Sequence, residues 1–270
     1  MMKRLFTLLA LLLPVLATAQ ESASDLDTDF GGRVAVGVNY KIAKGLHLKV
    51  EEELRMDNNF GSIDRLQTTI GLSYKLNSYL RFGVGYALLN PYKRSESLFA
   101  PPRHRLYGDV TGTLRWGDVQ FQLRERLQLT HREGTYNTFQ STPNSLALKS
   151  RFTVKYKGWQ KVEPSLGFEL RTTLNDPTGT VSGDVQYKKD GTAYMDYTPA
   201  GYTNMYISRY RGIAGLEWKI TQQHSLEPYV LLDYVSSYEL DVNGDGTRYF
   251  GDSYQNTFRT SVGLSFTYSF

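Results

Sequence analysis

Apolar and polar residues alternate along nearly every segment of the chain after residue 30, and no stretch has helical spacing. Between residues 30 and 42, for example, Val34, Val36 and Val38 share one face, whereas Arg33 and Lys41 share the other. The pattern predicts an all-β protein. Its expected strands are 30–42, 46–56, 64–76, 79–90, 104–116, 119–132, 144–157, 162–174, 204–220, 224–239 and 256–270. Because a tilted strand crosses a bilayer in about 9–11 residues, these strands are long enough to span one.

The connections between the strands alternate between two lengths. Tight turns are expected at 43–45, 77–78, 117–118, 158–161 and 221–223, and longer loops near 57–63, 91–103, 133–143, 175–203 and 240–255. Short turns on one rim and long loops on the other are typical of outer-membrane barrels, with the short turns in the periplasm. The longest loop is expected to hold its own hairpin at 185–197, turning at Asp190-Gly191.

An aromatic residue recurs on the apolar face just before the short turns. The repeat reads GVNYKI at 37–42, GLSYKL at 71–76 and GLEWKI at 215–220. The six aromatic residues are Tyr40, Tyr74, Trp116, Tyr156, Trp218 and Tyr268. At one height they predict a girdle at the headgroup level of a membrane. The alternative is ordinary core aromatics, which have no reason to gather before turns.

Alternation alone does not say which face of a barrel points inward. One interpretation is a soluble periplasmic barrel that binds an apolar ligand inside. Strand length, the girdle and the loop asymmetry favour the other: a transmembrane antiparallel up-and-down β-barrel of about 12 strands (10–12). Eleven strands would place the start of the first one outside. Either residues 21–30 add a short twelfth strand, or they pass through the lumen, or the count is off by one; twelve strands are expected.

The N-terminus predicts export. Lys3 and Arg4 precede an apolar run and the small residues Ala17-Thr18-Ala19, which indicates a signal peptide over residues 1–19. An N-terminal segment of 20–29 and a barrel of 30–270 follow, with the outer membrane as the expected location. The chain has no Cys, which excludes an acylated lipoprotein and disulfides.

Composition excludes two further classes of protein. Hydrophobic residues make up 40% of the chain and no apolar run beyond the signal reaches 18 residues, so a helical membrane protein is excluded. The formal net charge of +4 falls to about +2 without Lys3 and Arg4, which gives no basis for nucleic-acid binding.

The last strand carries a terminal pattern of Gly263, Phe266, Tyr268 and Phe270. It resembles the C-terminal signal of outer-membrane barrels, which implies the barrel-assembly machinery and outer-membrane lipid as partners. With the strand-end repeat and VEEELRM at 50–56, the chain resembles a family of Gram-negative outer-membrane β-barrels, typical of Bacteroidota, that is labelled a domain of unknown function. The resemblance implies a location and no reaction, and it leaves oligomeric state open.

The face opposite the apolar one is rich in charge of both signs. Its charged residues are Glu51, Glu53, Arg55, Arg124, Arg126, Lys149, Arg151, Glu169, Arg171, Arg209, Arg211, Glu227 and Asp233. Two interpretations coexist: an ion-pair network that fills and holds the barrel, and a narrow passive pore with a charged constriction. A structural or surface-binding platform is a further function that needs no open pore.

Catalysis has little support in the sequence. His224 and Ser225 are adjacent on a strand, so their side chains point to opposite faces and cannot form a dyad. No catalytic residue is predicted, and a lipid-modifying barrel enzyme is the less favoured alternative. Glu52 and Glu125 sort onto the apolar face, which would be explained by a protomer contact, a local bulge or protonated carboxylates.

One loop has the spacing of a calcium site. Asp241, Asn243, Asp245 and Asp252 occupy positions 1, 3, 5 and 12, with Gly246 at position 6. No other cofactor is expected. The alternative is a hairpin turn, because Asn243-Gly244 and Asp245-Gly246 are both strong turn formers.

Overall fold

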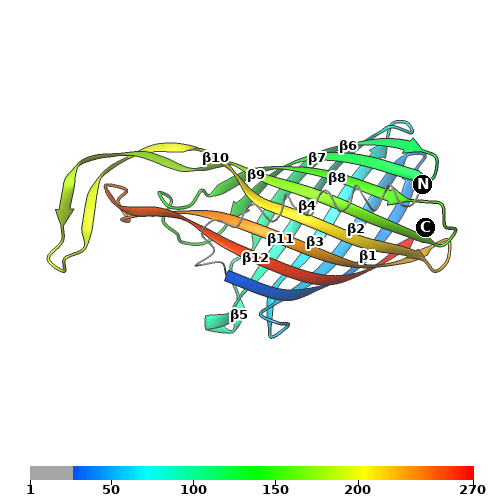
Figure 1. The fold of residues 1–270 in the computed structure, drawn as a ribbon, viewed down its shortest axis with the longest axis horizontal. Helices are drawn as coiled ribbons and strands as arrows, with labels where there is room; N and C mark the ends of the chain where they lie inside the picture. The colour runs from blue at the N-terminus through cyan, green and yellow to red at the C-terminus, as the bar shows by residue number, and fades with distance from the viewer. Residues whose placement is uncertain (1–26) are drawn as a thin grey trace, which may run out of the picture.

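A computed structural model describes residues 27–270, so the predicted signal peptide and most of segment 20–29 lie outside the described residues. Eleven long strands form one closed barrel (Figure 1). They are β1 (Asp27–Ala43), β2 (Leu46–Asp57), β3 (Ser62–Lys75), β4 (Leu80–Lys93), β6 (Arg103–Trp116), β7 (Val119–Arg132), β8 (Asn144–Tyr156), β9 (Val162–Tyr187), β10 (Ala193–Lys219), β11 (His224–Val242) and β12 (Arg248–Ser269). The β4–β6 loop adds a short helix, η1 (Arg94–Glu96), and a two-residue strand, β5 (Leu98–Phe99).

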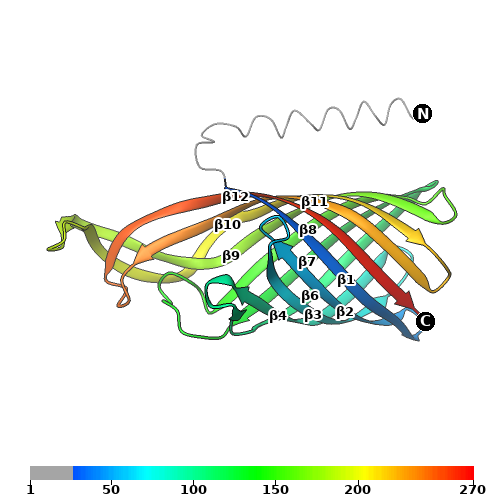
Figure 2. The same ribbon diagram turned by 90° about the horizontal axis from the view of Figure 1, so that it is seen from below.

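The barrel closes through a parallel pair of strands. Each long strand is antiparallel to its neighbours except β1 and β12, which run in parallel from Asp27 opposite Thr257 to Asn39 opposite Ser269. Eleven lies within the expected range, but the expected twelfth strand is wrong for the described residues, in which β1 already starts at Asp27. An odd number of up-and-down strands makes the first and last run the same way. The start of β1 therefore lies at the end of the barrel with the long loops (Figure 2).

All eleven predicted strands are present, and those near the end of the chain are longer than predicted. Strands β9 and β10 contain 26 and 27 residues and pair far beyond the barrel wall, as Figure 1 shows. The segments expected as loops 175–203 and 240–255 are therefore mostly strand. Five register shifts between β9 and β10 accommodate the departure from regular pairing. The predicted hairpin is confirmed, since the amide of Lys188 donates to the carbonyl of Thr192 across its turn.

The distribution of side chains is the inverse of that in a soluble protein. Large apolar residues are exposed all round the wall, among them Val36, Val84 and Leu114 at 55–60%. The fully buried residues of the wall include polar and charged ones such as Gln128, Glu169 and Asp233. Soluble proteins do not expose apolar surface as a continuous belt. No helix among residues 27–270 is long and apolar enough to cross a membrane.

Two inward tyrosines lie flat on glycines of the neighbouring strand. A Cβ added to Gly263 would come within 2.1 Å of the Tyr229 ring, and one added to Gly85 within 2.4 Å of the Tyr107 ring. Each glycine is the direct cross-strand partner of its tyrosine. Because glycine has no side chain, each tyrosine ring can pack flat against the wall and does not project into the lumen.

A small apolar core lies beyond the barrel, where the long hairpins meet. Tyr197 of β10 packs with Leu240 and Val242 of β11, and the ring of Phe139 from the β7–β8 loop packs against them. The Asn137 side-chain amide donates to the carbonyl oxygens of Val242 and Asn243, at 3.0 and 3.2 Å. The β7–β8 loop is therefore fixed to the tip of the β11–β12 hairpin.

Candidate functional site

The lumen of the barrel contains a polar cavity of about 530 Å³. Alternation along each strand directs every second side chain into it. Both signs of charge line it, but not equally: ten lining residues are basic and five are acidic. The basic residues are Arg33, Lys49, Arg55, Arg81, Arg105, Arg124, Arg126, Lys149, Arg151 and Arg211, and the acidic ones are Glu51, Glu53, Asp109, Glu169 and Glu227.

Glu169 of β9 is the centre of the largest ion-pair cluster. Its side chain is 1% exposed, and its Oε2 lies 2.6 Å from Nη2 of Arg151 and 3.6 Å from Nη2 of Arg124. Its Oε1 lies 3.4 Å from Nη2 of Arg209 and 3.8 Å from Nη1 of Arg211. We call these five residues the Glu169 hub. One carboxylate here is shared among four guanidinium groups, so the hub keeps a positive excess.

Two further carboxylates hold arginines of the lumen in place. Asp233 accepts two hydrogen bonds from Arg211, at 2.5 and 2.7 Å, and lies 3.6 Å from the Arg33 guanidinium. Asp109 accepts two from Arg126, whose guanidinium also lies 3.9 Å from the centre of the Tyr107 ring. In both pairs two donors of one guanidinium bind the carboxylate, and in the Arg211–Asp233 pair each donor has its own oxygen, which fixes the orientation of the arginine fork.

Three of the ten basic residues that line the cavity form no ion pair with a carboxylate of residues 27–270: Arg81, Arg105 and Lys149. Arg105 donates from Nε to Thr130 Oγ1 at 3.0 Å. The buried Nε atoms of Arg124 and of Arg209 also have no hydrogen-bond partner in the described structure. The lumen wall therefore presents donors and positive charge that its own carboxylates do not balance.

A separate ion-pair group lies inside the barrel on the side of the short turns. Glu163 contacts Lys219 and, at 2.9 Å, Lys157, while Lys155 donates to Glu217 at 2.6 Å. This group was not predicted from the sequence. The alternation that places Glu169 on the inner face of β9 places Glu163 there too, since the two residues are six positions apart.

All thirteen charged residues predicted for the lumen lie on its wall. The hub brings together Arg124, Glu169, Arg209 and Arg211, while Arg55 pairs with Glu53. Arg171 donates to Ser208 Oγ at 2.7 Å. Glu227 lines the cavity near Gly215, without a carboxylate-to-cation contact within 4 Å in the described part of the chain. The sequence analysis missed Arg105 and Asp109, which flank Tyr107 on the inner face of β6.

The six predicted girdle residues all lie where strands end at the short-turn rim, as do Phe266, Tyr268 and Phe270 of the C-terminal pattern. Trp116 is 79% exposed, and the Phe270 ring lies 5.0 Å from that of Tyr40 and 5.1 Å from that of Tyr268. Tyr79 and Trp159, which the sequence analysis did not include, add exposed aromatic surface from the short turns themselves. Gly263 seats the Tyr229 ring, and Phe266 is the outward partner of Leu226.

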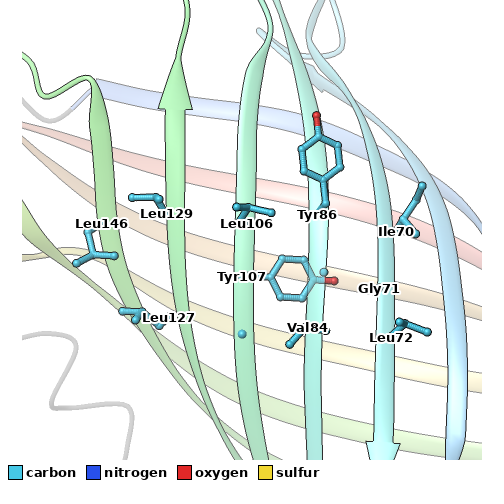
Figure 3. Close-up of a pocket in the computed structure, with 12 residues that line it drawn as sticks. Ile70, Gly71, Leu72, Val84, Tyr86, Leu106, Tyr107, Leu127, Leu129 and Leu146 are labelled. Atoms are coloured by element: carbon cyan, nitrogen blue, oxygen red, sulfur yellow. The ribbon is translucent and has the colours of Figure 1, made fainter.

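The outer wall has an apolar groove of about 630 Å³ across β3, β4, β6, β7 and β8 (Figure 3). Gly108 forms part of its floor, and Val84, Leu106 and Leu127 are among its walls. Glu125 lies two residues before Leu127 on the same outward face, and its Oε2 accepts a 2.6 Å hydrogen bond from Ser150 Oγ. Pairing is regular at Glu125 and at Glu52, so a local bulge does not explain either residue.

The predicted calcium ligands are not brought together. Asn243 Oδ1 accepts hydrogen bonds from the amides of Thr247 and Arg248, which makes it the turn former of the β11–β12 hairpin. Asp252 instead accepts from Tyr249 and Tyr238, and its hydrogen bond raises the pKa of Tyr249 to about 12. Among residues 27–270, no group of three or more His, Asp or Glu side chains is placed to hold a metal ion.

The histidine rings of the described chain have no serine partner. His224 Nδ1 lies 2.8 Å from Thr221 Oγ1, and His131 Nδ1 lies 2.9 Å from Asn144 Oδ1. His104 bridges Tyr86 and Glu133 on the outside of the barrel, at 2.6 and 3.0 Å. Tyr86 also lines the outer groove, so this network belongs to the outer wall and not to the lumen.

Comparisons with known proteins find a family. The model of a family described as a protein of unknown function, DUF2490, matches residues 34–187. No curated protein matches the chain. Among solved structures, the outer-membrane expressed OmpT of Vibrio cholerae is 11% identical, with a TM-score of 0.31 over 81% of this chain and 63% of that one. The chain thus spans less than two thirds of that structure's length.

Proposed function

The chain belongs to the DUF2490 family of unknown function, and from its structure we propose an integral outer-membrane barrel whose narrow, water-filled lumen passes small solutes. One observation carries the proposal: the wall is apolar outside and charged inside. A bilayer requires an apolar exterior, and a charged interior is tolerated where water fills it. The signal peptide expected over residues 1–19 and the girdle agree with this location.

The same observation argues against the soluble alternative. A soluble barrel with an apolar ligand would have to bury apolar residues in its lumen. The lumen here is lined by fifteen charged side chains, ten basic and five acidic. Water and ions fit such a cavity, whereas an apolar ligand does not.

A pair of adjacent variants tests whether the outer face contacts lipid. Leu123 points outward and is 51% exposed, whereas its neighbour Gln122 points into the lumen. We expect Leu123→Arg to make folding into bilayers less favourable by about 2–4 kcal/mol, because a lipid-facing Arg near the midplane costs that much. Gln122→Arg is the matched control. Equal stability of the two variants, or recovery of the protein in the soluble periplasmic fraction, would overturn the membrane proposal.

Conductance tests the pore itself. Heat-modifiable migration on gels identifies the folded barrel after extraction from outer membranes, and planar bilayers then report whether it conducts. We expect small, steady conductance steps, because the ion pairs leave a cavity of only about 530 Å³. If the folded barrel inserts but passes no ions in any salt, the pore proposal is wrong and the charged lumen has only a structural role.

A surface-binding platform is the second candidate, and the β9–β10 hairpin supports it. The hairpin extends beyond the wall and exposes Tyr187 at 70%. Replacing 183–195 with an Asn-Gly turn would join Ser182 and Asp196, which already face each other. We expect this variant to fold and conduct as the full chain does while losing any partner that the tip binds. Loss of conductance would instead make the hairpin part of the pore.

A further inference from the structure

The lumen contains more basic groups than its own carboxylates balance, and two adjacent cross-strand rows on one wall are mostly basic. The cross-strand row Arg124, Arg151, Glu169, Arg211 and Asp233 runs over β7 to β11. The next row toward the long loops is Arg126, Lys149, Arg171 and Arg209. Of the nine residues, seven are basic and two acidic. Even with Asp109 opposite Arg126, this wall remains positive.

Lys149 and Arg105 are two of the three cavity-lining cations that form no ion pair in the described structure, and Arg81 of β4 is the third. Lys149 lies beside the hub, and the charged groups that act most on it are Arg209, Glu169, Arg105 and Arg211. The four that act most on Arg105 are all arginines: Arg55, Arg65, Arg171 and Arg103. Neither residue has a carboxylate within 4 Å in the described structure. Cations so enclosed are unfavourable unless an anion or water accompanies them.

Unused hydrogen-bond donors point to the kind of anion. Arg124 and Arg209 each keep a buried Nε–H without a partner, although both contact Glu169 through Nη2. Guanidinium forks match the oxygen atoms of carboxylate and phosphate groups, and charge-assisted bonds to them are stronger than neutral ones. Chloride provides no such set of acceptors. A small oxyanion therefore fits both the charge and the donors.

We propose that the lumen binds a small oxyanion between the Glu169 hub, Lys149 and Arg105, and that the barrel passes anions in preference to cations. The oxyanion site requires only the folded barrel, whereas the selectivity for anions rests on the proposed pore function. The two acidic residues that line the cavity without an arginine partner, Glu51 and Glu227, do not offset the excess: Glu51 is paired with Lys49 at 2.6 Å, so Glu227 alone remains.

The binding test uses inorganic phosphate and the folded barrel in detergent. Phosphate should raise its unfolding temperature in a saturable way and give a binding isotherm in calorimetry. The double variant Lys149→Gln/Arg105→Gln should lose at least tenfold in affinity. The control Lys44→Gln/Lys189→Gln removes the same charge from exposed turns and should bind as the wild type does. Equal phosphate affinity in both double variants, or no binding by the wild type, would overturn the site.

The selectivity test uses the reversal potential in planar bilayers under a KCl gradient. The wild type should favour chloride, and the Lys149→Gln/Arg105→Gln variant should move the permeability ratio toward one. Glu227→Gln should move it the other way, because it adds to the positive excess. Heat-modifiable migration shows that each variant is folded. A conducting but cation-selective or unselective wild type refutes the preference and leaves the pore, whereas phosphate binding without any conductance refutes the pore and leaves the site.

Discussion

Replacing Glu169 with Gln removes the one charge that four arginines share. The substitution keeps the shape of the side chain, but it leaves Arg124, Arg151 and Arg209 without a carboxylate, while Arg211 keeps Asp233. A single ion pair at 4 Å contributes about 4 kcal/mol of Coulomb energy at an effective dielectric constant of 20. Mutual repulsion of the arginines and the dehydration of the carboxylate offset much of the sum. Removing one partner of a buried cluster typically costs about 3–5 kcal/mol.

We therefore expect Glu169→Gln to lower the free energy of unfolding by about 3–5 kcal/mol. Asp109→Asn is the matched comparison, because Asp109 has one arginine partner and leaves only Arg126 unpaired. Its expected cost is about 1–3 kcal/mol, that of leaving one hydrogen-bonded charge without its partner. Urea titration of both variants in lipid vesicles, followed by tryptophan fluorescence and heat-modifiable migration, measures the difference.

Phosphate gives this experiment a second readout. Since Glu169→Gln adds one to the positive excess of the lumen, phosphate should stabilise this variant more than the wild type, by mass action on the folded state. A variant as stable as the wild type would refute the hub as a source of stability. A destabilised variant that phosphate fails to stabilise more than the wild type would refute the account of the arginines as unbalanced charge.

Three further predictions address topology, packing and the outer turn. An epitope tag inserted at Asp190 should be detected on intact cells, and one at Gly117 only after the outer membrane is opened; the reverse result would invert the proposed orientation. Gly263→Ala should cost about 1–3 kcal/mol in the free energy of unfolding because its Cβ would overlap a tyrosine ring, whereas Gly37→Ala, with no neighbour nearer than 3.5 Å, should be nearly neutral. Equal effects would contradict the ring-on-glycine packing. Asn243→Ala should speed proteolysis of the β11–β12 turn, and calcium should leave cleavage of the wild type unchanged; protection by calcium would restore the metal site.

The sequence predicted the wall of the barrel because side chains on a strand alternate strictly. That rule placed Val36 outside and Glu169 inside without knowledge of pairing. It predicted the hairpin at 185–197, but not that β9 and β10 continue as paired strands from the wall to that hairpin. Pro177 and Pro199 are typical of loops, whereas the structure accommodates both at irregular places in the β9–β10 pairing. The local residue preferences are those of a loop, but pairing between β9 and β10 holds both segments as strands.

The positive excess of the lumen was beyond the reach of the sequence for a different reason. Both signs of charge occur on the inner face, and only the register shows that Glu169 serves four arginines while Lys149 has no carboxylate. The parallel closing pair was missed although eleven strands imply it, because a twelfth strand was expected to restore antiparallel closure. Balance of charge and closure are properties of neighbours far apart in the chain.

The parallel seam between β1 and β12 also bears on how the protein folds. Antiparallel strands that follow each other in the chain can begin to pair at the turn that connects them. Asp27 pairs with Thr257 only when the two ends of the barrel sequence come together. Ordering so long a loop lowers the rate of folding more than it lowers stability. The evenly spaced, slanted hydrogen bonds between the parallel strands β1 and β12 are also slightly weaker per residue than those of antiparallel strands. The seam is therefore expected to form last and open first, so the lifetime of the closed barrel depends on these two strands.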